Sequence, residues 1–583
     1  MPPNSVSVPP NTLYYGDNLD ILRRYVADES VDLVYLDPPF NSNANYNVLF
    51  KEHSGEQAAS QIRAFEDTWT WSMEAELALE SMIVEGGQVS VAMQALRKLL
   101  GTSNMMAYLA MMAPRLVELR RVLKPTGSIY LHCDPTASHY LKLLMDAVFG
   151  PENFRNEIIW RRTGTHSKVL RFGPIHDTIL FYTRGKTYTW NSPKRPYMRG
   201  HIKKHFVQDA EGWRTNYSGN VLTGSGTRNG ESGKPWKGFD PTAKGRHWAL
   251  PRTIVEDCAE DLTGLTQHEK LDRLHELGYI VIDPKQVWPF YEHRLKLSDG
   301  APIPDIWANQ PYTQGTVFGT EACIDEDVHW LSTSDSERLG YPTQKPLALL
   351  ERIVEASSNE GAVVLDPFCG CGTAIDAAQK LGRRWIGIDV TYLAIALIRR
   401  RLRDAYGEAV DATYDVIGEP ASVEDAKVLA EADPYQFQWW ALDQVHARGV
   451  ERKKGADKGI DGRIYFHEGD SGDVKQIIIS VKAGHTGRAH VHELRGVVDR
   501  EEAVIGVLIS MQATTKPMRE EAATAGFYTS PWGKHPRLQL LTVEDLLGGK
   551  GIDCPPLRQV SQTFKKAPKA AAKADATSLF DSD

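Results

Sequence analysis

The feature that most constrains this chain is a pair of short apolar segments, each ending in an aspartate and a proline. Residues 31–36 are followed by Asp37-Pro38-Pro39-Phe40, and residues 361–365 are followed by Asp366-Pro367. Runs of β-branched and large apolar residues are typical of buried parallel strands, and proline ends such a strand because it has no N–H to donate. Ligands of open α/β sheets bind at the carboxyl ends of strands. We therefore expect the two strand ends to meet in one cleft.

The first strand end carries groups suited to holding a nucleobase. The Asp37 carboxylate and the Pro38 carbonyl oxygen could both accept hydrogen bonds from one exocyclic amino group, and the Phe40 ring could stack on a flat base. This arrangement would hold an amine nitrogen still while it attacks a methyl donor. Taken alone, the motif favours a plain proline turn with a solvated aspartate, and it is the second strand end that changes the balance.

The second strand end opens a strand–turn–helix–strand pattern. A turn with Gly370 and Gly372 follows the first strand, residues 374–381 have helical composition, and the strand 384–389 ends in Asp389. Glycines let the backbone approach a ligand closely, and an acid about twenty residues further on can bind ribose hydroxyls. No Gly-Lys-Ser/Thr follows, so a triphosphate cradle is not indicated. The pattern is typical of an adenosine-binding unit.

Together these motifs resemble those of the S-adenosylmethionine-dependent DNA amino-methyltransferases. The pair is Asp-Pro-Pro-Phe and Asp-Pro-Phe-x-Gly-x-Gly-Thr, and the order, with the catalytic motif first, resembles the β group of that family. Residues 341–346 read Tyr-Pro-Thr-Gln-Lys-Pro, where the family usually has His-Pro-Thr-Gln-Lys-Pro. The resemblance covers roughly residues 12–405 and implies a Rossmann-like α/β sheet with an inserted target-recognition region.

The resemblance also implies which residues form the site. It assigns catalysis to Asp37, Pro38, Pro39 and Phe40, with no metal ion needed for the transfer. It assigns cofactor binding to residues from both halves of the chain, namely Asp17, Thr343, Gln344, Lys345, Asp366, Phe368, Gly370, Gly372, Thr373 and Asp389.

The implied reaction is methylation of adenine N6 in double-stranded DNA, within a restriction-modification or related system. Methylation of cytosine N4 is the alternative; that chemistry usually shows Ser-Pro-Pro-Tyr, so Asp37 favours adenine. Methylation of cytosine C5 needs a cysteine after a proline, which this sequence lacks. The family resemblance further suggests a homodimer and a restriction partner.

The chain has a net charge of −8, yet its middle is basic. Between residues 184 and 252 the cations outnumber the acids, and Trp190, Trp213, Trp236 and Trp248 are interleaved with them. Basic surfaces with aromatic side chains suit phosphate contact and base stacking. A solvated face with core tryptophans is the alternative. Because the segment lies between the halves of a methyltransferase, we assign it to DNA target recognition.

Residues 434–548 resemble the catalytic domain of Mrr-like restriction endonucleases. That family carries an aspartate and then Glu/Gln-x-Lys on the next strand, where the acids bind a divalent ion. Asp461 and Lys482 match, but Ser480 stands where the acid or amide belongs, and a hydroxyl is a poor substitute. The residues that could compensate are Gln438, Glu451 and Glu468. A bifunctional enzyme that also cuts DNA, with Mg²⁺, is one alternative; a DNA-binding remnant or a structural domain are the others.

The expected fold class is therefore α/β, with a second, smaller restriction-endonuclease-like α/β domain. Six cysteines lack metal-ligand spacing, no apolar run is long enough to cross a bilayer, and no signal peptide opens the chain, so we expect a cytoplasmic protein that does not enter membranes. The expected layout is a disordered 1–11, a catalytic half at 12–183, target recognition at 184–335, a cofactor half at 336–405, a linker at 406–433, the endonuclease-like domain at 434–548 and a tail at 549–583.

Overall fold

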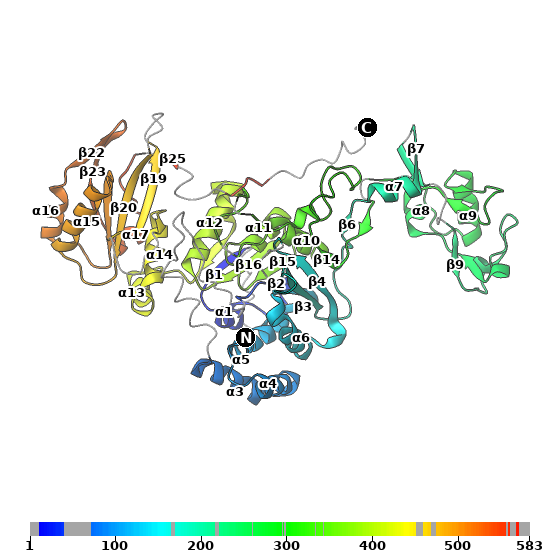
Figure 1. The fold of residues 1–583 in the computed structure, drawn as a ribbon, viewed down its shortest axis with the longest axis horizontal. Coiled ribbons are helices and arrows are strands. Elements are labelled where there is room, and N and C mark those ends of the chain that lie inside the picture. Colours follow the sequence, from blue (N-terminus) through cyan, green and yellow to red (C-terminus); the bar gives the residue numbers. More distant parts are fainter. Residues whose placement is uncertain are drawn as a thin grey trace. The chain divides into compact units, whose positions relative to one another are not determined.

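The computed structural model describes residues 11–39, 71–164, 170–210, 212–215, 221–258, 260–293, 295–296, 299–332, 334–341, 343–449, 459–467, 474–555, 558–559 and 567–570. The chain forms two compact units (Figure 1). The larger contains Met1–Asn191, Asp305–Ala308 and Asp327–Ala572; the smaller contains Ser192–Pro304, Asn309–Glu326 and Lys573–Asp583.

A nine-stranded sheet forms the centre of the larger unit, in the order β14-β4-β5-β3-β2-β15-β16-β1-β17. β5 runs antiparallel to its neighbours β3 and β4, and every other pairing is parallel. The strands are β1 (Thr12–Tyr15), β2 (Val31–Leu36), β3 (Leu123–Cys133), β4 (Phe154–Arg161), β5 (His176–Thr183), β14 (Ile306–Trp307), β15 (Val363–Asp366), β16 (Arg384–Asp389) and β17 (Asp415–Ile417). Both apolar segments predicted as parallel strands are therefore strands of one sheet.

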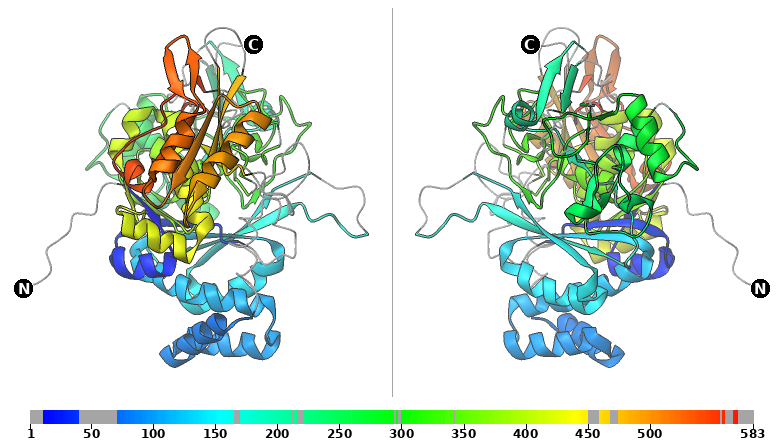
Figure 2. Two further views of the ribbon diagram at one scale, coloured as in Figure 1. Left: turned by 90° about the vertical axis from the view of Figure 1, so that its left-hand side faces the viewer. Right: turned by 90° about the vertical axis from the view of Figure 1, so that its right-hand side faces the viewer.

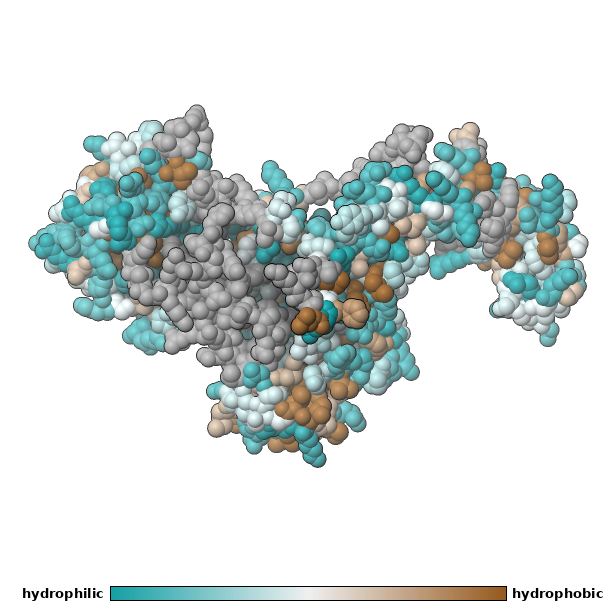
Figure 3. Space-filling view, in the orientation of Figure 1, coloured by the Kyte–Doolittle hydropathy of each residue, from teal (hydrophilic) through white to brown (hydrophobic). Residues whose placement is uncertain are grey.

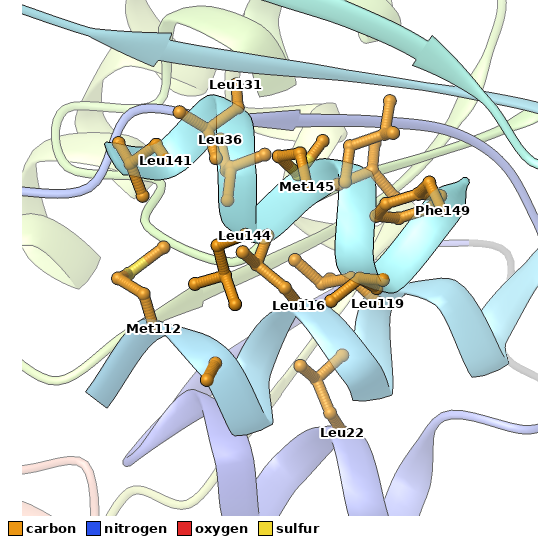
Figure 4. Close-up of a cluster of buried hydrophobic side chains, with 14 of the residues drawn as sticks. Leu22, Leu36, Met112, Leu116, Leu119, Leu131, Leu141, Leu144, Met145 and Phe149 are labelled. Atoms are coloured by element: carbon orange, nitrogen blue, oxygen red, sulfur yellow. The ribbon is translucent and has the colours of Figure 1, made fainter. Parts of the chain in front are cut away.

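Helices cover both faces of this sheet (Figures 1 and 2). On one face lie α1 (Asn18–Tyr25), α5 (Asn104–Val122) and α6 (Pro135–Phe149), and their leucines and methionines pack on Leu36 and Leu131 of the strands (Figure 4). On the other lie α10 (Leu347–Ser357), α11 (Thr373–Lys380) and α12 (Tyr392–Tyr406). Apolar side chains on both faces explain why these strands carry continuous apolar sequence rather than alternation.

A helical pair, α3 (Met73–Glu85) and α4 (Gly87–Leu100), packs against α5 and α6. Its exposed side includes apolar side chains among polar ones, and Figure 3 shows brown side chains there. The exposed large apolar side chains are Met73, Leu77, Ile83, Val84, Val91 and Leu99.

The endonuclease-like part has its own sheet, in the order β18-β19-β20-β21-β24, with β25 paired to β19. β20, β21 and β24 are parallel, and their isoleucines and valines are buried between helices, apart from the exposed Val474 at the start of β20. The strands are β18 (Arg448–Gly449), β19 (Gly462–His467), β20 (Val474–Lys482), β21 (Ile505–Ser510), β24 (Leu538–Thr542) and β25 (Arg558–Gln559), with a hairpin of β22 (Phe527–Ser530) and β23 (Gly533–Pro536). The helices are α13 (Val423–Ala432), α14 (Pro434–Gln444), α15 (Arg488–Arg500), α16 (Lys516–Ala523) and α17 (Val543–Leu547).

Residues 406–433, expected as a linker, contain regular structure. β17 pairs with β1 at the edge of the main sheet, and α13 begins at a capping box formed by Ser422 and Asp425. The polar, acidic composition gave no sign of β17, because an edge strand of three residues buries little apolar surface.

The smaller unit is built from short elements around a compact core. It contains β6 (Lys194–Arg195), α7 (Arg199–His205), β7 (Phe206–Asp209), β8 (Gly212–Thr215), β9 (Thr223–Ser225), β10 (Arg246–Trp248), α8 (Arg252–Asp257), α9 (Gln267–Glu276), β11 (Ile280–Val281), β12 (Phe290–Tyr291) and β13 (Ala301–Pro302). Its strands pair only as antiparallel two-stranded ribbons among the residues described.

Two tryptophans expected to stack on bases are core residues instead. Trp236 and Trp248 are buried, their rings meet edge to face at 5.7 Å, and leucines and isoleucines surround them. Large aromatic side chains bury much apolar area, so the two rings form this core together with the aliphatic side chains around them. Trp190, in the larger unit, stays exposed.

No helix among the residues described is both long and apolar enough to span a bilayer.

Candidate active site

The two strand ends predicted to meet lie on neighbouring strands. β2 and β15 pair in parallel, with Leu33 opposite Val364 and Val34 opposite Leu365, so the chain leaves both strands at the same edge. β15 also pairs in parallel with β16, and β16 pairs with β1, which places Tyr15 opposite Asp389. Four loops therefore begin side by side, after β1, β2, β15 and β16. The predicted residues Asp17, Asp37, Asp366 and Asp389 stand at or just beyond these four strand ends.

Asp37 is paired with a lysine from a distant segment. Its Oδ2 accepts a hydrogen bond from Lys345 Nζ, which also donates to the Thr343 carbonyl oxygen at 3.2 Å. Asp37 is half-buried and Pro38 is buried, so the carboxylate and the neighbouring carbonyl sit at the rim of the sheet and not in open solvent. The ion pair fixes the direction of the carboxylate. Phe40, the predicted base-stacking ring, lies outside the described residues.

The turn after β15 needs glycine at two positions. Gly370 has φ +49° and Gly372 has φ +76°, both left-handed. A Cβ on Gly372 would lie 2.7 Å from Ile398 Cγ1, and one on Gly370 would lie 3.1 Å from the Tyr341 ring. The turn is thus held tightly between α12 and the segment that carries Tyr341, and it leads directly into α11.

Asp389 joins the glycine turn to the loop after β16 through hydrogen bonds. Its Oδ2 accepts from Gly370 N at 2.9 Å, and its Oδ1 accepts from Thr391 N at 2.9 Å and Thr391 Oγ1 at 2.8 Å. Desolvation raises the pKa of this carboxyl. A carboxylate offers about four acceptor positions, so capacity remains for ligand hydroxyls.

Several predicted cofactor residues hold the loops themselves. Asp366 is buried, accepts from Phe368 N at 3.0 Å, and has a pKa raised well above its usual value by burial. The Gln344 side chain spans its own loop, accepting from Leu339 N and donating to Glu337 O, both at 2.8 Å. The Thr373 hydroxyl accepts from Arg401 Nη1 at 3.1 Å. Thr343 is exposed, and Phe368 packs half-buried on the core.

Asp17 caps α1, accepting from Leu19 N at 2.9 Å, and pairs with Arg115 Nη2 at 2.6 Å. Next to it stands Asn18, which sequence reasoning missed. Asn18 donates to the Pro367 carbonyl oxygen at 2.8 Å and accepts from Arg115 Nε at 2.6 Å. Asn18 and Arg115 therefore tie the β1 loop to the β15 turn. The available signal was a single arginine in the otherwise apolar middle of α5.

A set of buried, hydrogen-bonded side chains lies next to β2. Tyr35 Oη and His132 Nδ1 are 3.0 Å apart, and His132 Nε2 and Asp177 Oδ2 are 3.2 Å apart. Burial raises the pKa of Tyr35 well above its usual value, which keeps the phenol protonated. For Asp177, burial opposes ionisation, but the His132 hydrogen bond and nearby cations win and lower its pKa. Tyr35 lies in β2, two residues before Asp37, so these hydrogen bonds support the end of β2 from which Asp37 follows.

The endonuclease-like part presents a different aspartate. Asp461 is buried, and its Oδ2 accepts from Val481 N at 2.7 Å and from Ser480 Oγ at 3.2 Å. Gln438 donates to the Asp461 carbonyl oxygen at 3.5 Å, while Lys482 ends β20. Glu451 and Glu468, the other candidates for a metal ligand, lie outside the described residues. In the part of the chain that is described, no three His, Cys, Asp or Glu side chains gather as metal ligands.

Comparison with known families agrees with the geometry of the main sheet. The model of a family described as DNA methylase, N6_N4_Mtase, matches residues 31–398, which include both strand ends and both motifs. The chain belongs to this DNA methylase family. The methyltransferase fold and the class of enzyme predicted from the two motifs are thereby confirmed.

Relatives of this DNA methylase include modification enzymes. It is 30% identical over 414 residues to the type II methyltransferase M.EcaI of Enterobacter cloacae, covering 70% of this chain and 72% of that one. It is 28% identical over 377 residues to the Mod subunit of the type III restriction-modification enzyme StyLTI of Salmonella typhimurium, covering 64% of this chain and half of that subunit. The crystal structure of a putative DNA modification methylase of Thermus thermophilus with S-adenosyl-L-methionine covers 70% of this chain and 99% of that one, at 15% identity and a TM-score of 0.31.

A second family model matches the C-terminal part of the methylase. Residues 434–547 match NACHT-associated inactive Restriction Endonuclease 1. The restriction-endonuclease-like nature of this part is therefore confirmed.

Proposed function

We propose that this DNA methylase transfers the methyl group of S-adenosylmethionine to N6 of adenine in double-stranded DNA, as the modification enzyme of a restriction-modification system. The observation that carries the proposal is the adjacency of β2 and β15. It places the Asp37 carboxylate and the Pro38 carbonyl beside the glycine turn, where an amine acceptor and a methyl donor have to meet.

The residues of the cofactor half fit an adenosine ligand. Gly370 and Gly372 leave the turn without side chains at its tightest points, and Asp389 keeps acceptor capacity for ribose hydroxyls. Asp17, Asp366, Phe368 and Thr373 shape the walls, with Thr343, Gln344 and Lys345 closing the pocket from the other segment. The bound cofactor supplies an electrophilic methyl group on a sulfonium.

The chemistry left to the protein is mainly positioning. The lone pair of the adenine amine is delocalised into the ring, and hydrogen bonds from the amine to Asp37 and to the Pro38 carbonyl localise it and aim it. The nitrogen gains the methyl group and loses one proton, for which the Asp37 carboxylate is the acceptor within reach. The base reaches the site by leaving the duplex, at a cost of a few kcal/mol, and Phe40 holds its ring.

Lys345 has a second role in this scheme. Its ammonium occupies the Asp37 Oδ2 position that an incoming amine would use. The lysine orients the carboxylate before DNA binds and moves aside when the target amine arrives.

The competing substrate is the N4 amine of cytosine, which belongs to the same family description. Mass spectrometry of nucleosides from DNA incubated with the enzyme and S-adenosylmethionine distinguishes them. N6-methyladenine is the expected product. N4-methylcytosine in its place overturns the substrate assignment, and no modified base overturns the proposed reaction.

The remaining assignments follow from the family setting. The smaller unit, within the expected 184–335 region, reads the DNA target. A restriction subunit is the partner, as the word Mod in the StyLTI relative implies for that protein, and two copies of the chain form the enzyme. The protein works in the cytoplasm, where cellular DNA is modified.

The C-terminal part does not cut DNA in this proposal. Ser480 replaces a metal-binding side chain and donates to Asp461, so the single acid of the motif is already used inside the protein. Incubation of supercoiled plasmid with wild-type enzyme and Mg²⁺ tests this, with Lys482→Ala as the control. Nicking by the wild type that Lys482→Ala abolishes would establish a bifunctional enzyme.

A further inference from the structure

The endonuclease-like part contacts the methylase at the start of α12, next to the loop that carries the proposed cofactor residue Asp389. Tyr392 opens α12, three residues after Asp389, and its backbone N–H donates to Gln436 Oε1 at 2.9 Å. Gln436 lies in the first turn of α14, inside the region matched by the endonuclease family. The first N–H groups of a helix have no partner within it. Here one of them is satisfied by a side chain of the endonuclease-like part.

Two aromatic rings extend this contact. The Tyr392 side chain is buried in a cluster with Phe437 and Trp440 of α14, and the Tyr15 ring stacks on it at 3.8 Å with an interplanar angle of 28°. Tyr15 ends β1 directly opposite Asp389. The ends of β1 and the start of α12, which both border the pocket, are thus anchored in the core of the other part.

Ion pairs also contribute to the contact between α12 and α14. Arg399 of α12 bonds Asp443 of α14 at 3.2 Å and Glu419 at 2.6 Å, and all three side chains are largely buried. Partly buried, hydrogen-bonded pairs of this kind fix a geometry better than exposed ones. α12 therefore meets α14 through hydrogen bonds, stacked rings and ion pairs together.

A continuous set of hydrogen bonds leads from α14 to the glycine turn. Tyr392 N donates to Gln436 Oε1, and the preceding Thr391 N donates to Asp389 Oδ1. Asp389 Oδ2 in turn accepts from Gly370 N. Every bond in this set joins a side chain to a backbone N–H, so its geometry depends on where the loop between β16 and α12 lies.

We infer that the endonuclease-like part is a structural component of the cofactor pocket, and that Gln436 is a positioning residue which holds the β16–α12 loop so that Asp389 faces the ribose. This inference rests on the proposed cofactor. It gives the part a role within the methylase that needs neither a metal ion nor DNA cleavage.

The test compares two glutamines of one helix in the full chain. Gln436→Ala removes the contact with Tyr392, whereas Gln438→Ala removes a contact made wholly inside the endonuclease-like part, to the Asp461 carbonyl. Titration calorimetry with S-adenosylmethionine should show a Kd raised about fivefold by Gln436→Ala, the usual effect of one hydrogen bond. Gln438→Ala should leave the Kd unchanged. Gln436→Glu, which keeps the acceptor oxygen, should restore binding to near the wild-type value.

Equal Kd values for wild type and Gln436→Ala would overturn the inference, as would equal weakening by both alanine variants. A wild-type protein that does not bind S-adenosylmethionine would instead refute the proposed function. Hydrogen exchange on the wild type provides a second test that does not depend on a folded variant. Added S-adenosylmethionine should slow exchange in peptides that cover residues 392–399 and 434–444, and unchanged exchange in both would also overturn the inference.

Discussion

The two sheets of the larger unit each have a motif aspartate beside a strand, and the two carboxylates have different surroundings. Asp37 is half-buried, and its partner is the side-chain ammonium of Lys345 from a distant segment. Asp461 is buried, and its carboxylate accepts from a backbone N–H and from Ser480, neither of which can leave without local unfolding. The same residue type is therefore partly accessible beside one sheet, as the proposed reaction requires, and is a buried structural acceptor in the other.

Removing Asp37 should have the largest effect. Asp37→Ala deletes the acceptor that positions the amine, so kcat for methyl transfer should fall by about a thousandfold or more, as for other groups that orient and stabilise a reacting atom. The Kd for S-adenosylmethionine should change little. Methylation rate and calorimetry on the same preparation check this, and parallel loss of both activities would show instead that Asp37 serves folding or cofactor capture.

Replacing glycine by alanine should destabilise the protein in the turn after β15 but not in the turn after β20. Gly372→Ala combines a left-handed backbone with a contact of 2.7 Å to Ile398, so we expect a loss of about 2–4 kcal/mol in the free energy of unfolding and weaker cofactor binding. Gly484→Ala, after β20, meets nothing within 4 Å and is the matched control. Denaturant unfolding measures both, and equal losses would contradict the assigned strain.

Asp461→Ala should reduce stability without changing chemistry. The buried Val481 N–H and Ser480 hydroxyl lose their acceptor, which costs about 1–3 kcal/mol. Plasmid DNA should remain intact with either protein and Mg²⁺. A variant as stable as the wild type, or a nicking activity that disappears with Asp461, would place this residue with Asp37 as a reactive group.

The smallest expected effect is a pH dependence of cofactor binding. The pKa of Asp389 is raised, so on acidification its carboxylate takes up a proton earlier than an ordinary aspartate and loses acceptor capacity for ribose hydroxyls. The Kd for S-adenosylmethionine should rise as pH falls through this raised pKa. By linkage, the same group makes folding less favourable as pH rises from the ordinary to the raised pKa, because the folded state binds the proton more tightly. Asp389→Asn should flatten the binding profile, and an unchanged slope would exclude Asp389 as its source.

Much of the fold and part of the site could be predicted because their signals are local. A buried strand, its terminating proline and a glycine turn each show in a few consecutive residues, and the parallel arrangement then brings Asp37 and Asp366 to one edge. The contacts that join distant segments have no such signal. Neither the pairing of Lys345 with Asp37 nor that of Gln436 with Tyr392 follows from spacing, because each depends on how separate elements dock.

The tryptophans of the middle region show the opposite error. Basic residues and aromatic rings alternate there, and composition alone does not distinguish a stacking surface from a small hydrophobic core. Trp236 and Trp248 are buried in the core of the smaller unit, together with its leucines and isoleucines. These residues form a separate core because they belong to the smaller unit. The boundary between the two units is visible only in three dimensions.

β14 sets a practical rule for exchanging the smaller unit between enzymes. The chain leaves the larger unit after Asn191, and residues 305–308 belong to it again, where β14 pairs with Ile159 and Trp160 of the main sheet. Residues 309–326 belong to the smaller unit. A chimera that replaces residues 192–326 as one cassette would delete an edge strand of the host, together with the Trp307 ring on which Arg352 rests at 5.1 Å. A chimera that exchanges the smaller unit should therefore have four junctions and keep residues 305–308 of the recipient.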